Sequence, residues 1–325
     1  MRIGVVGGGA WGTALAQVAA EGGETLLWAR EPEVVESVNL ERVNTLFLPG
    51  RSLHPSIRAT GALAELSDCG ALLVVTPAQH MRASLAALPR LSAPLILCSK
   101  GIEEESMKLM HEVAREEQPE APIAVLSGPT FAYEVAAGLP AAVTLAVKDA
   151  AVGERLRARL ARPWFRPYLS DDVAGAEIGG AVKNVLAIAC GVVEGRRLGQ
   201  NARSALISRG FAEMTRFGLA RGARAETLAG LSGLGDLVLT CSSVSSRNFS
   251  LGKGLGEGRG AAELLADRRT VAEGAFTAPV LHRAARRAGV DMPIVAAVCA
   301  LLAGEAEVDE VVERLLSRPL RPEGV

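Results

Sequence analysis

The sequence predicts an α/β protein in which a doubly wound, mostly parallel sheet is followed by an all-helical region. Short β-rich runs alternate with helical patterns in the first half, and a glycine-rich turn follows the first of these runs. The β-rich runs stop after about residue 170, and from there the chain is rich in alanine and leucine with glycine at intervals. We therefore expect a sheet domain over residues 1–175 and a helical domain over residues 176–325.

Each expected element corresponds to a pattern of its own. The β-rich runs predict strands at residues 3–6, 25–28, 71–75, 95–98, 123–126 and 143–147. Between them, apolar residues with a period near 3.6 predict helices over residues 17–21, 33–43, 81–88 and 107–116. In the second half the same period predicts helices near residues 176–194, 204–220, 276–288, 292–303 and 307–316.

Composition argues against several classes of protein. The formal net charge of -1 over 325 residues disfavours a surface for nucleic acid or anionic membranes. Five scattered cysteines without a C-x-x-C pair indicate core thiols in a reducing compartment, and four histidines without ligand spacing predict no metal. Glycines in the first twelve residues disfavour a signal peptide, and no uncharged apolar run reaches the roughly 18 residues of a membrane helix. We expect a cytoplasmic protein with no membrane insertion.

The stretch IGVVGGGAWGTALA has the pattern G-x-G-x-x-G at Gly7, Gly9 and Gly12, between an apolar strand and a helix. In this context the first glycine permits a tight turn and the second lets the backbone approach a pyrophosphate. The third lets the helix pack closely on the strand, and the start of the helix attracts negative charge. The pattern predicts a dinucleotide site.

The end of the second strand bears on which dinucleotide binds. Arg30 stands where an acidic side chain commonly accepts hydrogen bonds from a ribose, and a guanidinium there suits the 2′-phosphate of NADP. Trp28 or Trp11 would cover apolar cofactor surface. Glu31 follows directly, so the sequence favours NADP and leaves NAD open.

Polar stretches also follow later strands, at the edge of the sheet where ligands of doubly wound folds bind. Lys100 is the cation among them, and Gly128, Pro129 and Thr130 form a turn that suits a small polar substrate.

In the helical half, the stretch SSRN places a helix cap beside a guanidinium. Ser245 or Ser246 would cap a helix that begins at Arg247 and Asn248. Hydroxyl, backbone N–H and guanidinium groups would then converge on one anion, such as the phosphate of a substrate.

Lys183 lies in an apolar, small-residue stretch, GGAVKNVLAIACG, that predicts a helix. Lysine is scarce here, with five positions against a large majority of arginine, and an amine can exchange a proton where a guanidinium cannot. A site for proton transfer would therefore use this lysine, although a side chain extending from a helix edge to water is the alternative. We expect its small neighbours, residues 179, 180, 187 and 190, to leave room for a substrate and a nicotinamide.

Together these motifs resemble those of the bacterial-type NAD(P)-dependent glycerol-3-phosphate dehydrogenases over nearly the whole chain. The matching stretches, in order, are GGGAWGTALA, LPG, CSKGIE, LSGPTFAYEVAAGLP, GGAVKNVLAIACGVVEG, LSGLGDLVLTCSS, SSRN and VAEG. Members of the family transfer a hydride between NAD(P)H and dihydroxyacetone phosphate, giving sn-glycerol 3-phosphate for glycerophospholipid synthesis.

The resemblance implies a fold, an assembly and a set of site residues. The fold is a Rossmann-type sheet domain followed by an all-α domain similar to the C-terminal domain of 6-phosphogluconate dehydrogenases, and the assembly is a homodimer. Lys183 would exchange the proton, with Asp236 or Asn184 orienting it and Lys100 disfavouring a second ammonium. The substrate residues implied are Lys100, Gly128, Thr130, Lys183, Asp236, Ser246, Arg247 and Asn248. The cofactor residues implied are Gly7, Gly9, Ala10, Trp11, Gly12, Arg30, Lys100, Ala132, Arg247, Val271 and Glu273.

The chain departs from the family pattern in small ways. Ala10 stands where serine is common, Phe47 stands where tyrosine is common, and VAEG is followed by AFTAP. The first two bear on cofactor affinity alone. Two other functions stay open: a related hydroxyacid or phosphogluconate-type dehydrogenase, and a dinucleotide-sensing protein without catalysis.

Overall fold

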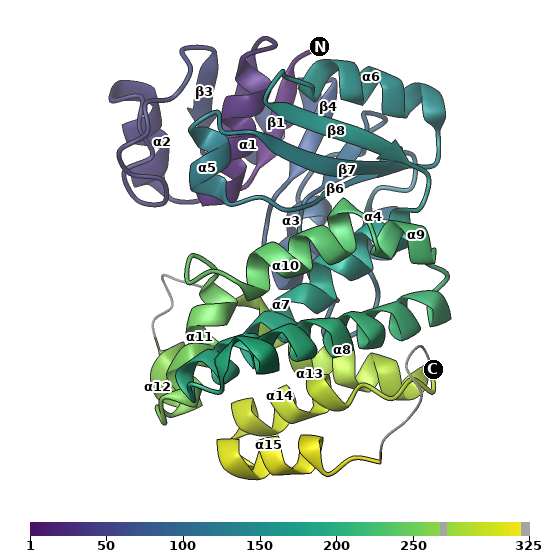
Figure 1. The fold of residues 1–325 in the computed structure, drawn as a ribbon. Coiled ribbons are helices and arrows are strands. Elements are labelled where there is room, and N and C mark those ends of the chain that lie inside the picture. The colour runs from purple at the N-terminus through teal and green to yellow at the C-terminus, as the bar shows by residue number, and fades with distance from the viewer. Residues whose placement is uncertain (267–271, 320–325) are drawn as a thin grey trace. The chain divides into compact units, whose positions relative to one another are not determined.

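The protein is described by a computed structural model over residues 1–266 and 272–319, which forms two compact units. Unit 1 comprises Met1–Lys100 and Lys108–Glu177, whereas unit 2 comprises Gly101–Met107 and the chain from Ile178 onward. Unit 1 contains the sheet and the helices that flank it, and unit 2 is helical (Figure 1). The predicted α/β class with a helical second part is therefore confirmed.

Unit 1 is built on an eight-stranded sheet with the order β3-β2-β1-β4-β5-β6-β7-β8. Neighbouring strands are parallel except β6 and β7, which are antiparallel. Because β1 lies between β2 and β4, the strand order reverses there, and ligands of doubly wound sheets bind at such a reversal. The strands are β1 Ile3–Val6, β2 Thr25–Trp28, β3 Ile57–Thr60, β4 Ala71–Val74, β5 Leu95–Leu97, β6 Ile123–Ser127, β7 Ala141–Val147 and β8 Phe165–Ser170.

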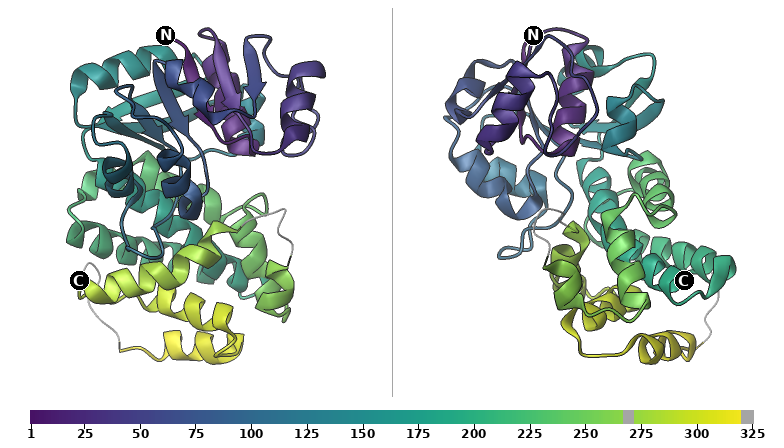
Figure 2. Two further views of the ribbon diagram at one scale, coloured as in Figure 1. Left: turned by 180° about the vertical axis from the view of Figure 1, so that it is seen from behind. Right: turned by 90° about the vertical axis from the view of Figure 1, so that its left-hand side faces the viewer.

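Helices cover both faces of this sheet, and each face has its own core (Figure 2). Along β4, Leu73 packs with α1, α2 and α6, whereas Leu72 and Val74 pack with α3 and α4, as the alternation of side chains along a strand requires. The helices are α1 Ala10–Ala20, α2 Pro32–Leu40, α3 Ala78–Ala86, α4 Met110–Glu117, α5 Ala132–Ala136 and α6 Ala150–Leu160, with a 3-10 turn η1 at Leu63–Asp68.

The expected strands agree with β1, β2, β4, β5, β6 and β7 to within two residues at either end. Strands β3 and β8 were not expected, and they are the two edges of the sheet. An edge strand is less fully covered, so its sequence is less apolar: β3 exposes Arg58, and β8 carries Arg166 and Pro167. The antiparallel direction of β7 was not expected either.

Unit 2 contains long helices joined by short ones. They are α7 Val173–Gly195, α8 Gly199–Ala220, α9 Ala225–Leu228, the π-helical turn η2 Leu231–Gly235, α10 Asp236–Cys241, α11 Arg247–Gly256, α12 Ala261–Leu265, α13 Glu273–Arg287, α14 Pro293–Ala303 and α15 Val308–Leu316. Five of them follow the expected ranges. Helix α7 starts three residues before the expected boundary at residue 176 and continues across it, so its first turns belong to unit 1.

Two apolar helices of unit 2 lie in its interior. Within the described residues, α7 is the one helix long and apolar enough to cross a membrane, but 94% of its apolar window is buried inside the protein. Such burial is typical of a core helix in a globular fold. Helix α14 also buries its apolar side chains, among them Val295 and Val298, so this segment packs in the core.

Candidate active site

The glycine-rich loop between β1 and α1 has the geometry that its sequence predicts. Gly7 has a φ of +127°, a conformation that L side chains rarely adopt. A Cβ at Gly12 would lie 1.9 Å from the carbonyl oxygen of Gly7, so a side chain there would separate the helix from the loop. A Cβ at Gly9 would meet nothing within 4 Å, which leaves the loop backbone accessible to a ligand.

This loop fits the pyrophosphate of a dinucleotide. Helix α1 begins at Ala10 after Gly9, and no side chain caps it, so the N–H groups of its first turn are available to an anion. The indole Nε1 of Trp11 is buried without a hydrogen-bond partner, which adds an unused donor beside the loop. The first turn of α1 carries no acidic residue. Its N–H donors are therefore not opposed by a nearby negative charge, and they suit a negatively charged group.

Arg30 follows β2 at the surface of unit 1. Its side chain is 79% exposed and pairs with Glu31 at 2.8 Å between Nη2 and Oε1. The indole of Trp28 donates to the carbonyl of Gly61 at 3.1 Å, so its nitrogen is already engaged. An ion pair this exposed contributes little, so it competes only weakly with binding of a 2′-phosphate, and NADP and NAD both stay open.

The turn after β6 carries several of the predicted residues. A Cβ at Gly128 would lie 2.9 Å from the Cα of Val143 on β7, so glycine permits this turn to pack on the neighbouring strand. Thr130 donates its hydroxyl to the carbonyl of Gly128 at 3.1 Å, and Ala132 begins α5, which packs on α1. Lys100, after β5, is half-buried.

Two hydroxyls at the same edge of the sheet were missed by sequence reasoning. Thr76 follows β4, Ser127 ends β6, and both hydroxyl oxygens are buried without a hydrogen-bond partner. Buried polar groups are almost always paired in proteins, so unpaired hydroxyls at a ligand-binding edge suit contact with a ligand. Their signal in the sequence was their place directly at the ends of strands.

Lys183 is buried in unit 2 and forms a cluster with two residues of α10. Its Nζ donates to Asp236 Oδ1 at 2.6 Å and to Thr240 Oγ1 at 2.8 Å. The side chains of Lys183 and Asp236 are 8% and 0% exposed, so the lysine does not extend to bulk water. The Asp236 carboxylate offsets the free-energy cost of burying the Lys183 ammonium. The two hydrogen bonds also hold Nζ in a fixed place. Asp236 was expected beside Lys183; Thr240, one helical turn later, was not.

Gly179, one helical turn before Lys183, permits close backbone packing and does not leave space for a substrate. A Cβ at Gly179 would lie 2.3 Å from the carbonyl oxygen of Ser232, so this glycine lets η2 pack directly on α7. Ala187 and Cys190 are fully buried. The expectation that this helix face leaves room for a substrate is therefore wrong at Gly179, where the missing side chain brings the segment that carries Asp236 close to Lys183.

The same kind of close packing positions the predicted anion site. Gly191 and Gly252 let the backbones of α7 and α11 touch, because a Cβ at either would lie within 2.0 Å of a carbonyl oxygen on the other helix. At the start of α11, Ser246 accepts a hydrogen bond from the N–H of Phe249 at 3.3 Å, which is the predicted cap. Arg247 is exposed at the first position of the helix.

Asn248 connects α11 to α13. Its Oδ1 accepts a hydrogen bond from the N–H of Gly274 at 2.9 Å, and a Cβ at Gly274 would clash with the carbonyl oxygen of Asn184 at 2.5 Å. The next residue of α7 after Lys183 is thus in contact with the first turn of α13, where Glu273 lies. Val271 lies outside the described residues.

The thiol of Cys241 lies near the lysine cluster and is held in its protonated form. Burial raises the pKa of Cys241 well above its ordinary value, and its contact with Cys190 raises it further. All five cysteines are free, and four are buried, as expected for core residues.

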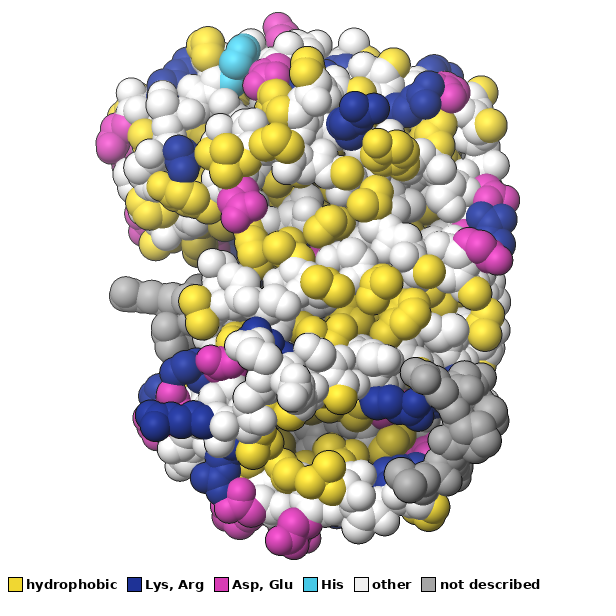
Figure 3. All heavy atoms as spheres, viewed as in Figure 1, with side chains coloured by type: hydrophobic (Ala, Val, Ile, Leu, Met, Phe, Trp, Pro, Cys, Tyr) yellow, Lys and Arg dark blue, Asp and Glu magenta, His cyan; other side chains and the backbone are white. Residues whose placement is uncertain are grey.

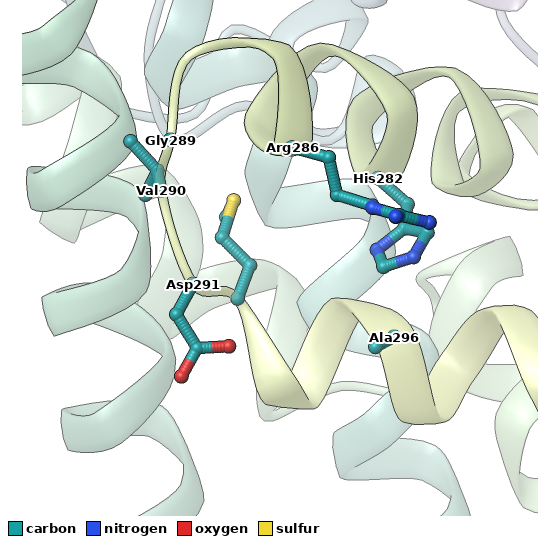
Figure 4. A pocket seen from close by; sticks show the side chains of 7 residues that line it. His282, Arg286, Gly289, Val290, Asp291 and Ala296 are labelled. Carbon is teal, nitrogen blue, oxygen red and sulfur yellow. The ribbon is translucent and has the colours of Figure 1, made fainter.

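A cavity of about 460 Å³ lies elsewhere in unit 2, between α13 and α14 (Figure 4). His282 and Arg286 line it from one helix, and Asp291 and Met292 line it from the connection. None of the predicted site residues borders it, so its volume does not identify the active site.

Comparison with known proteins decides the family. The sequence model described as NAD-dependent glycerol-3-phosphate dehydrogenase N-terminus matches residues 2–153, and the model of the C-terminus of the same family matches residues 172–313. The chain belongs to the NAD-dependent glycerol-3-phosphate dehydrogenase family.

Similar proteins of this family cover almost the entire chain. A glycerol-3-phosphate dehydrogenase [NAD(P)+] of Erythrobacter litoralis is 66% identical over 99% of this chain and 98% of its own. One from Sphingopyxis alaskensis is 63% identical with the same coverage. A crystal structure of glycerol-3-phosphate dehydrogenase from Coxiella burnetii has a TM-score of 0.93 at 37% identity and covers 98% of this chain and 99% of that one.

The structure places these predicted residues at four positions, two in each unit. Within unit 1 these are the glycine-rich loop with Trp11 and Ala132 near it, and separately Arg30. Within unit 2 they are Lys183 with Asp236, and the cap of α11 with Asn248 and Gly274.

Proposed function

We propose that the protein catalyses the reversible reduction of dihydroxyacetone phosphate to sn-glycerol 3-phosphate, with NADH or NADPH as the reductant. The observation that carries this proposal is the buried Lys183 ammonium, held by Asp236 and Thr240, in a chain of this family. A bound reduced nicotinamide supplies the hydride that adds to the carbonyl carbon of the substrate.

Lys183 supplies the proton of the reaction. As negative charge develops on the carbonyl oxygen, the ammonium donates its proton there and becomes a neutral amine, which regains a proton from solvent. In the oxidative direction the neutral amine accepts the proton of the alcohol. Asp236 and Thr240 hold Nζ in place in both directions, because their oxygens accept hydrogen bonds from it at 2.6 and 2.8 Å.

The start of α11 supplies the grip on the substrate phosphate. The helix has ten residues and no acidic residue in its first turn, and Ser246 and Arg247 stand at its N-terminus. A phosphate there would receive backbone N–H groups and a bidentate guanidinium. Asn248 aligns this end of the helix through its bond to Gly274. Lys100, Gly128 and Thr130 complete the proposed substrate set.

Residues 1–175 serve as the dinucleotide-binding domain and residues 176–325 as the substrate and catalytic domain in this proposal. The pyrophosphate occupies the loop of Gly7, Gly9, Ala10, Trp11 and Gly12, whose backbone fits it. Arg30, Lys100, Ala132, Arg247, Val271 and Glu273 make up the rest of the dinucleotide site.

We also propose a cytoplasmic homodimer that supplies glycerophospholipid synthesis. Support for self-association comes from exposed apolar side chains on neighbouring helices of unit 2, including Leu219 on α8 and Val238 on α10. Figure 3 displays hydrophobic side chains gathered over α10 on the face in view. Sedimentation velocity measures the assembly, and a monomer at micromolar concentration would contradict the dimer.

The activity is tested by mixing the purified protein with NADH or NADPH and dihydroxyacetone phosphate and following the absorbance of the reduced nicotinamide. We expect rapid oxidation with the phosphate ester and little with unphosphorylated dihydroxyacetone, because α11 would bind the phosphate. Binding of NADH without turnover across the neutral pH range would instead indicate a dinucleotide sensor.

A further inference from the structure

Asn44 is a fully buried polar residue in the connection between α2 and β3. Both N–H groups of its side-chain amide are used: Nδ2 donates to the carbonyl of Gly8 and to Thr13 Oγ1, each at 2.8 Å. Its Oδ1 accepts from the N–H of Phe47 at 3.0 Å. Every polar atom of this side chain therefore has a partner, and two of the three partners belong to the glycine-rich loop or to α1.

Thr13 extends this network to the next peptide of the loop. Its hydroxyl accepts the hydrogen bond from Asn44 and donates to the carbonyl of Gly9 at 2.9 Å. The backbone N–H of Thr13 donates to the same carbonyl, also at 2.9 Å. The carbonyl groups of Gly8 and Gly9 are thus both held from the protein side.

Fixing these carbonyls fixes the N–H groups that a ligand meets. In a planar trans peptide the C=O of one residue and the N–H of the next point in opposite directions. Holding the Gly8 carbonyl directs the N–H of Gly9 away from Asn44, and holding the Gly9 carbonyl does the same for the N–H of Ala10. Gly9 has no side chain and open space around it, so the Gly8–Gly9 peptide depends mainly on the bond from Asn44. The Gly9 carbonyl is also held by the helical bond from the N–H of Thr13, to which the Thr13 hydroxyl adds a second bond.

We propose that Asn44 is a positioning residue for dinucleotide binding, which holds the peptides of Gly8 and, through Thr13, of Gly9 so that their N–H partners face the pyrophosphate. This inference rests on the proposed function, because it assumes that the dinucleotide binds at this loop. Asn44 also anchors the residues that follow it, since Phe47 donates to its side-chain oxygen and Leu48 donates to its backbone carbonyl at 3.0 Å.

The chain offers a matched control in Gln118. It is another buried amide of unit 1, whose nitrogen donates to the carbonyls of Leu85 and Pro89 and whose oxygen accepts from the N–H of Leu91. It caps the end of α4, which leads into the start of β6, so it lies at the opposite edge of the sheet from the loop. Asn44→Ala and Gln118→Ala each remove one buried amide of the same bonding pattern.

The experiment compares ligand affinities of the two variants and the wild type by calorimetry or fluorescence titration. We expect Asn44→Ala to weaken NADH and ADP by the same factor, at least about tenfold, because both contain a pyrophosphate. Affinity for adenosine, which lacks phosphate, should stay within about twofold of the wild type. Gln118→Ala should leave all three affinities unchanged, although both variants lower the melting temperature. At saturating NADH, Asn44→Ala should keep the wild-type KM for dihydroxyacetone phosphate.

Variants of Thr13 test the same proposal even if Asn44→Ala does not fold. Thr13→Val keeps the shape but loses the hydroxyl, and it should weaken NADH several-fold, whereas Thr13→Ser keeps the hydroxyl and should restore affinity. The positioning role would be overturned if Asn44→Ala and Gln118→Ala bound NADH with equal affinity. It would also be overturned if Thr13→Val and Thr13→Ser bound NADH with equal affinity. A wild type that binds neither NADH nor ADP would instead refute the proposed function itself, and the positioning role with it.

Discussion

In unit 1 the proposed anion site is made of backbone groups around Gly7, Gly9 and Gly12, whereas in unit 2 the proposed proton site is made of the side chains of Lys183 and Asp236. The first presents oriented N–H groups that do not titrate, and it depends on the absence of side chains. The second buries two opposite charges that stabilise each other and depends on their chemical identity. We therefore expect the loop to be sensitive to added volume, and the cluster to be sensitive to the loss of a charge.

Loss of the charge at Lys183 should affect activity most. Lys183→Ala should lower kcat at least about 100-fold, because the proton donor to the developing alkoxide is lost. The Kd for NADH should stay near the wild-type value, since the amine exchanges a proton and does not bind the pyrophosphate. Steady-state kinetics and NADH titration check both parts. Lys253→Ala, at an exposed pair on α11, is the control, and near-normal turnover of Lys183→Ala would rule out its role.

The second prediction tests sensitivity to volume in the loop. Gly12→Ala should lower the free energy of unfolding by about 2 kcal/mol and abolish tight NADH binding, because its Cβ would lie 1.9 Å from the Gly7 carbonyl oxygen. Gly9→Ala meets nothing within 4 Å, so its stability should change by less than about 0.5 kcal/mol while NADH affinity still falls. Urea denaturation and titration measure the two quantities. Equal NADH affinity in Gly9→Ala and the wild type would mean that the pyrophosphate binds elsewhere.

Glu213 is a buried acid of unit 2 whose carboxyl group is bonded to backbone rather than to an ammonium. It accepts hydrogen bonds from the N–H groups of Ile294 and Val295 at 2.8 and 3.3 Å, and burial raises its pKa from 4.5 to about 7. The folded protein keeps this proton up to about pH 7, while the unfolded chain loses it near pH 4.5. Stability from this group is therefore fully present below pH 4.5 and is lost as the pH rises toward 7.

From this shift we expect Glu213 to contribute a fall of about 2 kcal/mol in the free energy of unfolding between about pH 5.5 and pH 7. Glu213→Gln should remove this part of the pH dependence, whereas Glu257→Gln, at an exposed pair with Lys253, should leave it unchanged. Denaturation curves across this pH range provide the measurement. The same slope in Glu213→Gln as in the wild type would show that another group titrates.

The smallest effect is expected at Arg30, where a charged side chain is added to a site otherwise made of backbone. Arg30→Ala should raise the KM for NADPH by about tenfold or less and leave that for NADH within about twofold, because the guanidinium is 79% exposed and already paired with Glu31. Glu31→Gln frees the guanidinium and should shift preference toward NADPH. Unchanged NADPH kinetics in both variants would remove Arg30 from the 2′-phosphate site.

Central elements of the fold were predictable because their sequences are locally distinctive. β1 and β4 are short apolar runs covered on both faces, and the glycine pattern after β1 allows few other structures. Edge strands β3 and β8 were missed because exposure on an edge permits arginine and proline, which weaken a β pattern. Short helices such as α10, which has glycine before it and serine after it, have too few turns to show a helical period in their apolar residues.

A dinucleotide loop, a lysine helix and a capped helix that carries a guanidinium can be read from the sequence without a structure, since each depends on residues close together in the chain. The folded structure was needed to choose Asp236 over Asn184 as the partner of Lys183 and to add Thr240 to it. It was also needed to show that Gly179 makes room for backbone rather than for substrate, and that Asn44 holds Gly8. The hydrogen-bonded pairs among these residues are 36 to 57 positions apart in the sequence. Such contacts form only when packing brings distant segments within about 3 Å, and no local pattern encodes that approach.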